Sequence, residues 1–145
     1  LVMNLGFFSC LFMLKRKGKY YYNLDDLSGL SKNHPILSLS MLIILFSLAG
    51  IPPLAGFFAK FYIFTAVIEE SMYFLAIVGL LSTVIAAYYY LRLIKIIYFD
   101  SEKEKYETNH NIGLKISLLI SSIFILFYFI YPSWLTEIIE NIIII

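Results

Sequence analysis

One lysine in this chain offers a specific chemistry, which is proton transfer. Lys60 is the only charged residue between Ile36 and Ile68, in an otherwise apolar stretch. Withdrawing an ammonium from water disfavours its charged form, so a lysine in such surroundings can take up and release protons near neutral pH. A nearby cation would promote release of the proton, and a nearby carboxylate would promote its retention. A lysine whose neighbours change can therefore work as a proton switch.

A helix-breaking motif lies just before this lysine. Residues 50–56 read Gly-Ile-Pro-Pro-Leu-Ala-Gly, and the second glycine precedes the lysine by four residues, about one helical turn. Pro52 and Pro53 lack backbone donors, which interrupts a helix. Gly50 and Gly56 allow backbone conformations that other residues resist. The motif therefore predicts a break in the chain at these residues.

The apolar segment at residues 36–68 is too long for one upright membrane helix. A straight helix of this length would reach ~50 Å, whereas the hydrocarbon core of a bilayer is ~30 Å thick. We predict a discontinuous transmembrane helix, broken at residues 50–56. Unpaired backbone at membrane depth is tolerated where it is buried in protein or lines a cavity, and broken helices recur at the ion sites of transporters. The break therefore points to an ion pathway, with Lys60 near the midplane.

The surroundings of Lys60 allow two interpretations. Its ammonium has to be met by a cavity, by carbonyls freed at the break, or by an acid outside this sequence, because all ten acidic residues fall in connections or in the tail. In the first interpretation, Lys60 transfers protons. In the second, it reaches the interface or pairs statically and holds helices together. Its depth and the neighbouring break favour the first.

Two other titratable side chains are candidates for a proton path. His34 precedes the long segment at its inner end, where an imidazole can relay protons, although it also suits a plain helix-start turn. Tyr88 opens a run of three tyrosines before Arg92, which fits either a proton route or an aromatic belt at the membrane boundary. Ser47, within the long segment, is more typical of an interhelical hydrogen bond than of a water chain.

The composition excludes several classes of function. The chain is 61% hydrophobic and 14% charged, whereas soluble domains average ~25% charged residues. A net charge of +1 provides no field that would attract nucleic acid. The single cysteine, Cys10, cannot form an internal disulfide or complete a metal site or an iron–sulfur cluster. We expect an all-α polytopic membrane protein in the lipid bilayer, with no nucleic-acid partner, metal site or redox centre.

Charge-free stretches and basic residues together indicate four membrane crossings. Lysine and arginine stay on the inner side of short loops, and ten of the eleven lie within residues 15–32 or 92–115. The apolar run at residues 1–14 is shorter than the ~20 residues of a crossing, so we expect a C-terminal fragment. The predicted order is the end of a transmembrane helix at 1–14, a cytoplasmic or matrix-side loop at 15–35, the discontinuous transmembrane helix at 36–68, a transmembrane helix at 72–95, an inner loop at 96–111, a transmembrane helix at 112–131 and an outer-face tail at 132–145.

Several motifs along the chain resemble those of one known family. The run SLAGIPPLAGFFAKFY at residues 47–62 resembles the broken-helix motif of the antiporter-like subunits of respiratory complex I, NADH:quinone oxidoreductase. VMNLG at residues 2–6, KFY at 60–62 and YYYLR at 88–92 are similar to subunit 2 of that complex, called subunit N in bacteria. The resemblance covers nearly the whole chain and is strongest at residues 40–92.

This resemblance implies both a fold and a function. The antiporter-like fold has fourteen transmembrane helices, of which this chain would be the C-terminal part, with Lys60 at the position of a lysine near the outlet of the proton channel. The implied function is proton translocation coupled to electron transfer from NADH to quinone. The implied partners are other complex I membrane subunits, including neighbouring antiporter-like subunits. The resemblance also implies no cofactor in this chain, because other subunits bind NADH, flavin, iron–sulfur clusters and quinone.

The expected location is the bacterial cytoplasmic membrane or, alternatively, the mitochondrial inner membrane.

Two other functions compete with the implied one. A subunit of a multisubunit sodium/proton antiporter shares the Gly-Ile-Pro-Pro break and the lysine, and a purely structural membrane protein would only anchor an assembly. Replacing Lys60 separates the three. Proton pumping is lost in an assembled complex in the first case, antiport independent of NADH is lost in the second, and little beyond assembly changes in the third.

Overall fold

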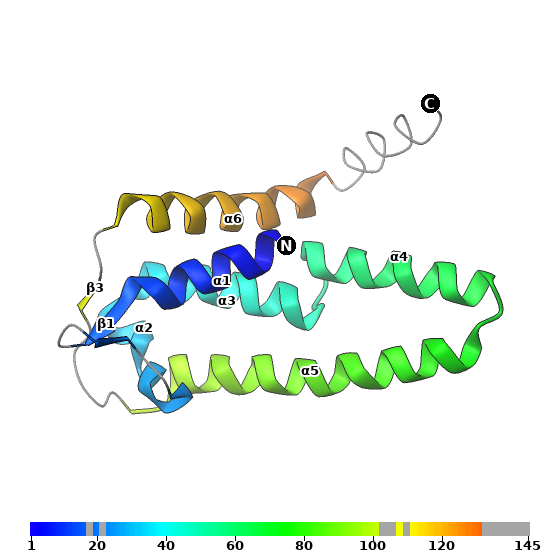
Figure 1. Cartoon of the computed structure of the whole chain (residues 1–145), viewed down its shortest axis with the longest axis horizontal. Helices are drawn as coiled ribbons and strands as arrows, with labels where there is room; N and C mark the ends of the chain where they lie inside the picture. Colours follow the sequence, from blue (N-terminus) through cyan, green and yellow to red (C-terminus); the bar gives the residue numbers. More distant parts are fainter. Residues whose placement is uncertain (17–18, 21–22, 102–106, 109–110, 132–145) are drawn as a thin grey trace.

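The computed structural model is a set of helices joined by short connections (Figure 1). It describes residues 1–16, 19–20, 23–101, 107–108 and 111–131. The helices are α1 (Val2–Met13), η1 (Leu24–Leu27), α2 (Leu30–Asn33), α3 (Pro35–Ala49), α4 (Ala55–Glu69), α5 (Tyr73–Phe99) and α6 (Ile112–Ile130), and the strands are β1 (Leu14–Arg16), β2 (Lys19–Tyr20) and β3 (Glu107–Thr108). The tail predicted at residues 132–145 lies outside the described residues.

A small antiparallel sheet joins the two connections predicted on the inner side, and we call this end of the molecule the inner end. The strand order is β2-β1-β3. Lys15 of β1 pairs with Tyr20 of β2, and Leu14 of β1 pairs with Thr108 of β3. The predicted all-α class is confirmed for the bulk of the described chain. The sheet is an addition, because strands this short carry no periodicity that a sequence pattern could reveal.

The connection predicted at residues 15–35 also contains two short helices. One turn of 3-10 helix, η1, is closed by a capping box in which the Asn23 N–H donates to Oδ2 of Asp26 over 3.3 Å. The helix α2 follows, and Gly29 precedes it with a φ of +69°, in the left-handed region that favours glycine. These turns seat the chain so that His34 immediately precedes α3.

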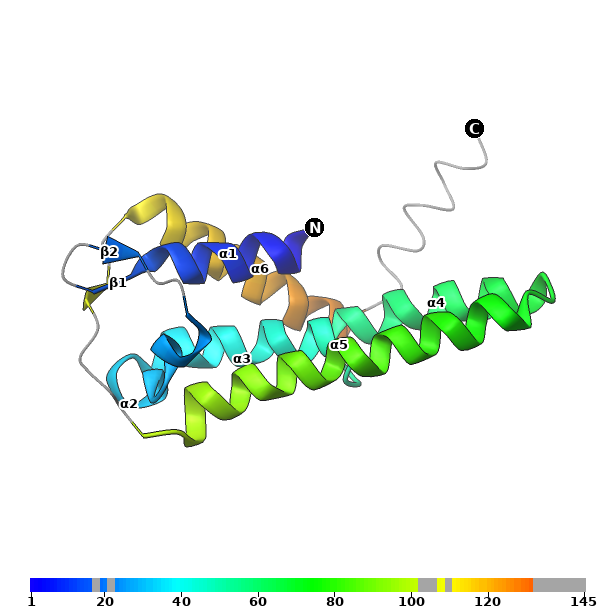
Figure 2. The same ribbon diagram turned by 60° about the horizontal axis from the view of Figure 1, so that its bottom comes forward.

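The helix α3 forms the centre of the molecule. It contacts α1, α5 and α6 along its length, and α1 lies beside α6 (Figure 2). Met41, Ile44 and Leu45 of α3 are fully buried between these helices. The approach of α1 to α6 depends on Gly6, where a Cβ atom would lie only 2.7 Å from the Cβ of Ser121. Small residues at such crossings are typical of membrane helix packing.

The long helix α5 is the one helix among the described residues with the length and hydropathy of a membrane-spanning segment. None of its most apolar window is buried inside the chain, which fits a surface in contact with lipid or further protein. Its last turn is different, because Ile96 and Ile97 are buried in the hydrophobic core. The inner loop that the sequence predicted from residue 96 therefore begins later, at Asp100, because these isoleucines continue the helix.

The helices α3 and α4 follow each other nearly in line (Figure 1). Each has 15 residues, and a helix of that length measures ~22 Å, less than the ~30 Å hydrocarbon core. Neither helix is long enough to cross a bilayer alone. The break between them therefore falls well inside the membrane when both helices run along one crossing.

Candidate functional site

The interruption between α3 and α4 begins with a glycine that ends the first helix. Gly50 has a φ of +82° and donates its N–H to the carbonyl oxygens of Phe46 at 3.1 Å and Ser47 at 3.0 Å. The N–H of Ile51 also reaches the Phe46 oxygen, at 3.1 Å. A glycine in the left-handed region with such backward hydrogen bonds is a common helix C-terminus. Two of the last carbonyls of α3 are thereby satisfied.

The other two terminal carbonyls of α3 are satisfied by a side chain from α4. The Nζ atom of Lys60 donates to the carbonyl oxygens of Leu48 at 3.2 Å and Ala49 at 2.9 Å. The last four carbonyls of a helix have no partner within the helix, and they form the negative end of its dipole. The ammonium of Lys60 therefore lies where the backbone itself supplies negative potential. The sequence left three possible environments for this ammonium: a cavity, carbonyls freed at the break, or an acid outside this sequence. In the structure, the ammonium is bound by the freed carbonyls.

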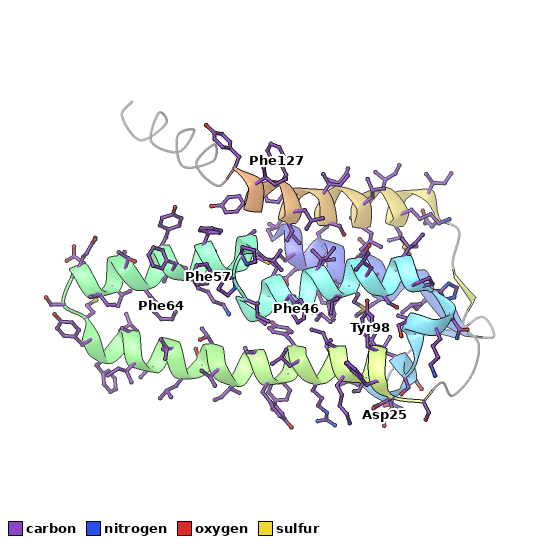
Figure 3. All side chains as sticks on the ribbon, turned by 180° about the vertical axis from the view of Figure 1, so that it is seen from behind. Asp25, Phe46, Phe57, Phe64, Tyr98 and Phe127 are labelled. Atoms are coloured by element: carbon purple, nitrogen blue, oxygen red, sulfur yellow. The ribbon has the colours of Figure 1, made fainter. Side chains whose placement is uncertain are left out.

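Glycine shapes the space on both sides of the break. A Cβ at Gly50 would come within 2.9 to 3.2 Å of the Cδ, Nζ and Cε atoms of Lys60, so the lysine side chain lies directly against this glycine. A Cβ at Gly56 would overlap the carbonyl oxygen of Ser47. The prolines Pro52 and Pro53 occupy the turn between the two glycines, outside both helices. Phe46 on α3 and Phe57 on α4 flank the interruption (Figure 3).

Ser47 connects the two half-helices. Its hydroxyl oxygen accepts a hydrogen bond from the N–H of Gly56 over 3.0 Å, and its hydroxyl donates to the sulfur of Met3 over 2.9 Å. The predicted interhelical role of this serine is confirmed, although the sequence did not indicate its partners. The residue that precedes α4 is Leu54, which has no polar atom with which to cap the helix.

His34 lies at the inner end, far from Lys60 along α3. Fifteen residues of helix separate it from Gly50, which corresponds to ~22 Å. It lines a cavity of about 540 Å³ between α1, α3 and α6, together with Lys115, Ser40 and Ser122. Ser122 is buried, and its hydroxyl has no hydrogen-bond partner among the described residues. No pattern in the sequence predicts this cavity, because the residues that line it lie far apart along the chain.

Tyr88 lies on the exposed surface of α5. Its side chain is 63% exposed, and its ring meets that of Tyr89 edge-on, with centroids 5.7 Å apart. Among the described residues, the ring contact of Tyr88 is with Tyr89 and not with Lys60 or His34, the other two residues of the predicted proton path. The role of Tyr88 in a proton path stays a prediction.

Among the described residues, no group of three or more His, Cys, Asp and Glu side chains is placed to hold a metal ion. The one cysteine, Cys10, is fully buried, and its thiol lies 3.6 Å from the sulfur of Met41.

The donors and acceptors at the helix break are an ammonium, backbone carbonyls and a hydroxyl. This set can hold and transfer a proton.

Comparisons with known proteins agree on one family. Residues 1–86 match the family model described as NADH:quinone oxidoreductase/Mrp antiporter, transmembrane. The chain is 76% identical over 142 residues to NADH-quinone oxidoreductase subunit N of Pelagibacter ubique, covering 98% of this chain and 30% of that protein. It is 48% identical over 132 residues to the protein of the same description from Parvibaculum lavamentivorans, covering 91% of this chain and 27% of that protein. The chain thus spans less than a third of the length of these relatives.

A solved structure shares the fold. The match is to a chain of respiratory complex I from Thermus thermophilus with bound aureothin, with a TM-score of 0.65 and 26% sequence identity. It covers 76% of this chain and 26% of the other. The antiporter-like helical fold predicted from the sequence is confirmed by this match and by the family model. The chain is a membrane protein and belongs to the NADH:quinone oxidoreductase/Mrp antiporter transmembrane family.

Proposed function

We propose that this chain is part of a proton-translocating membrane subunit of NADH:quinone oxidoreductase, in which electron transfer from NADH to quinone drives protons across the membrane. The family membership supports this function. So do the relatives described as subunit N and the solved structure of respiratory complex I. The chain takes part in the enzyme as a subunit, and we propose that NADH, flavin, iron–sulfur clusters and quinone bind to other subunits.

Lys60 is the group that carries the proton in this proposal, and its contact with the end of α3 is the observation on which the site rests. The ammonium is held by the Leu48 and Ala49 carbonyls. A change of charge at a neighbouring site would drive the proton from Nζ toward the outer side, leaving a neutral amine that is reloaded from the inner side. Such coupling needs two arrangements of the site that differ in energy, because proximity alone shifts no equilibrium.

The cavity at the inner end is the proposed start of the route. It is lined by His34 and by the hydroxyls of Ser40 and Ser122. Histidine is a common proton relay in proteins. The break residues Gly50, Pro52, Pro53 and Gly56 form the proposed far end, where Lys60 lies. Tyr88 belongs to the proposal only as a candidate, because its side chain lies on the exposed surface of α5.

The proposed setting is a multisubunit assembly in the cytoplasmic membrane of a bacterium. The two relatives described above are bacterial proteins, which supports this location over the mitochondrial inner membrane. The exposed apolar surface of α5 fits contact with lipid or with other membrane subunits of the complex, including neighbouring antiporter-like subunits. A multisubunit sodium/proton antiporter is the less favoured alternative, because the relatives from Pelagibacter ubique and Parvibaculum lavamentivorans are both described as NADH-quinone oxidoreductase subunit N.

Purification of the full-length protein from its native membranes tests the function. We expect a tagged protein to co-purify with NADH oxidation and quinone reduction. In vesicles, the purified assembly should transport protons on addition of NADH, with no requirement for sodium. Sodium/proton exchange in the absence of NADH, without associated quinone reductase activity, would support the antiporter and contradict the proposal.

A further inference from the structure

The first backbone N–H groups of α4 need partners from outside the helix. The first four N–H groups of any helix lack intrahelical acceptors, and a polar side chain just before the helix usually supplies one. The residue in that place is Leu54, which has no such atom and makes no side-chain cap. The N–H of Phe57 turns back to the Leu54 carbonyl over 3.0 Å. The buried N–H of Gly56 needs another acceptor.

Ser47 supplies this acceptor from the other half of the broken helix. It is completely buried, and its Oγ accepts from the Gly56 N–H over 3.0 Å across nine residues of sequence. The missing side chain of Gly56 is what permits the approach, since a Cβ there would overlap the Ser47 carbonyl. The serine thus caps α4 although it belongs to α3.

The same hydroxyl reaches a third element. Its proton points to the sulfur of Met3 on α1, 2.9 Å away. Thioether sulfur is a weak acceptor, so the bond to Gly56 is the stronger restraint. One hydroxyl therefore links α1, α3 and α4 at the break.

We propose that Ser47 is a positioning residue that ties the two half-helices together and holds the Leu48 and Ala49 carbonyls in place for the Lys60 ammonium. The inference rests on the proposed function of Lys60. Ser47 immediately precedes Leu48 in the chain, so a shift of α3 against α4 would move the acceptors on one side and the lysine on the other. Lys60 and Gly56 are four residues apart on α4, on the same helical face.

Two variants of Ser47 separate its hydrogen bond from its volume. Ser47→Ala removes the acceptor, whereas Ser47→Cys keeps a side chain of similar size with a much weaker acceptor. Ser38→Ala is the matched control, because Ser38 is also a fully buried serine of α3, and its hydroxyl has no hydrogen-bond partner among the described residues. Each variant is made in the full-length subunit within the assembled complex.

Two measurements are made on each assembled variant. The first is amide hydrogen exchange in peptides covering residues 54–58, which reports the cap on α4. The second is the number of protons transported per NADH oxidised. We expect Ser47→Ala to raise the exchange rate by ~10-fold, the size expected for a lost buried hydrogen bond. We expect the same variant to lower the proton yield. In both measurements, we expect Ser47→Cys to give values close to those of Ser47→Ala, and Ser38→Ala to give the values of the unmodified protein.

The outcomes distinguish failure of this inference from failure of the proposed function. Unchanged exchange and proton yield in Ser47→Ala would overturn the inference, as would a Ser47→Cys variant that behaves like the unmodified protein while Ser47→Ala is impaired, since volume alone would then explain the result. If Ser47→Ala does not assemble, Ser47→Cys carries both measurements. If Lys60→Ala keeps full proton transport, the function proposed for Lys60 fails, whatever the exchange data show for the cap.

Discussion

At the scale of single residues, the question is how an ammonium is tolerated beside a helix break inside a membrane. Placing a lysine at the centre of a membrane helix costs ~2.5–3.5 kcal/mol on insertion scales. Hydrogen bonds from a charged donor contribute ~1.5–3 kcal/mol each, and Lys60 makes two of them to the α3 carbonyls. The two bonds are therefore large enough to offset the cost.

Gly50→Ala tests how closely the lysine fits against the break. The alanine would pay ~1–2 kcal/mol for the left-handed backbone, and its Cβ would lie within 3.2 Å of three Lys60 atoms. We expect a lower Tm and a loss of NADH-driven proton transport in vesicles. Gly29→Ala is the matched control, because Gly29 also has a positive φ, of +69°, but it lies just before the short helix α2 and away from Lys60. Equal effects of both variants on proton transport would contradict a specific contact with Lys60.

The sequence alone identified Lys60, because a solitary charge in an apolar stretch is visible in the residue order. It left open which group meets the ammonium. The answer is the backbone of Leu48 and Ala49, whose side chains carry no polar atom. Backbone acceptors are the same for every residue type, so no pattern of side chains predicts which carbonyls a lysine will reach.

At the scale of elements, each half-helix supplies a side chain that satisfies unpaired backbone groups at the end of the other. The lysine of α4 satisfies the end of α3, and the serine of α3 satisfies the start of α4. Proline and glycine made the existence of a break predictable, since both residue types oppose a continuous helix. This mutual pairing was not predictable, because it depends on the angle at which the two halves meet. The helices α5 and α6 each contact both halves, so that angle depends on tertiary packing as well as on local propensity.

Gly56→Ala tests the close approach of the two halves. The added methyl would overlap the Ser47 carbonyl oxygen, which is backbone and cannot rotate away. We expect a destabilisation of ~1–3 kcal/mol, typical of overpacking, seen as a lower Tm of the full-length protein in detergent. Gly79→Ala is the control, because the nearest atom there belongs to the movable ring of Phe64, 3.0 Å away. A Tm loss no larger than that of the control would argue against a tight junction.

At the scale of the whole molecule, α3 links two distant sites. Its inner end lines the cavity with His34, and its outer end holds Lys60 through its last carbonyls. The two ends lie ~22 Å apart, too far for direct proton transfer. A route between them needs further groups, and the full-length relatives contain more than twice as much chain beyond the part matched here. This length limits what the present sequence could predict about the middle of the path.

His34→Ala tests the inner end of this route. Loss of the imidazole should slow NADH-driven proton transport by ~2- to 10-fold, less than a full general acid–base contribution because the hydroxyls of Ser40 and Ser122 line the same cavity. Met13→Leu is the control, since it keeps the apolar wall and the volume of the same cavity. The rate of proton transport in vesicles is the measurement. If His34→Ala and Met13→Leu transport protons at the same rate, His34 is not part of the proton path.

The central claim is that Lys60 changes its protonation as protons cross the membrane. The most direct measurement is the number of protons transported per NADH oxidised by an assembled complex carrying Lys60→Ala, compared with one carrying Lys60→Arg. The account predicts that both variants assemble and that both lose proton transport, because alanine has no proton to exchange and arginine stays charged at all relevant pH values. Proton transport at the unmodified level in Lys60→Ala would contradict it.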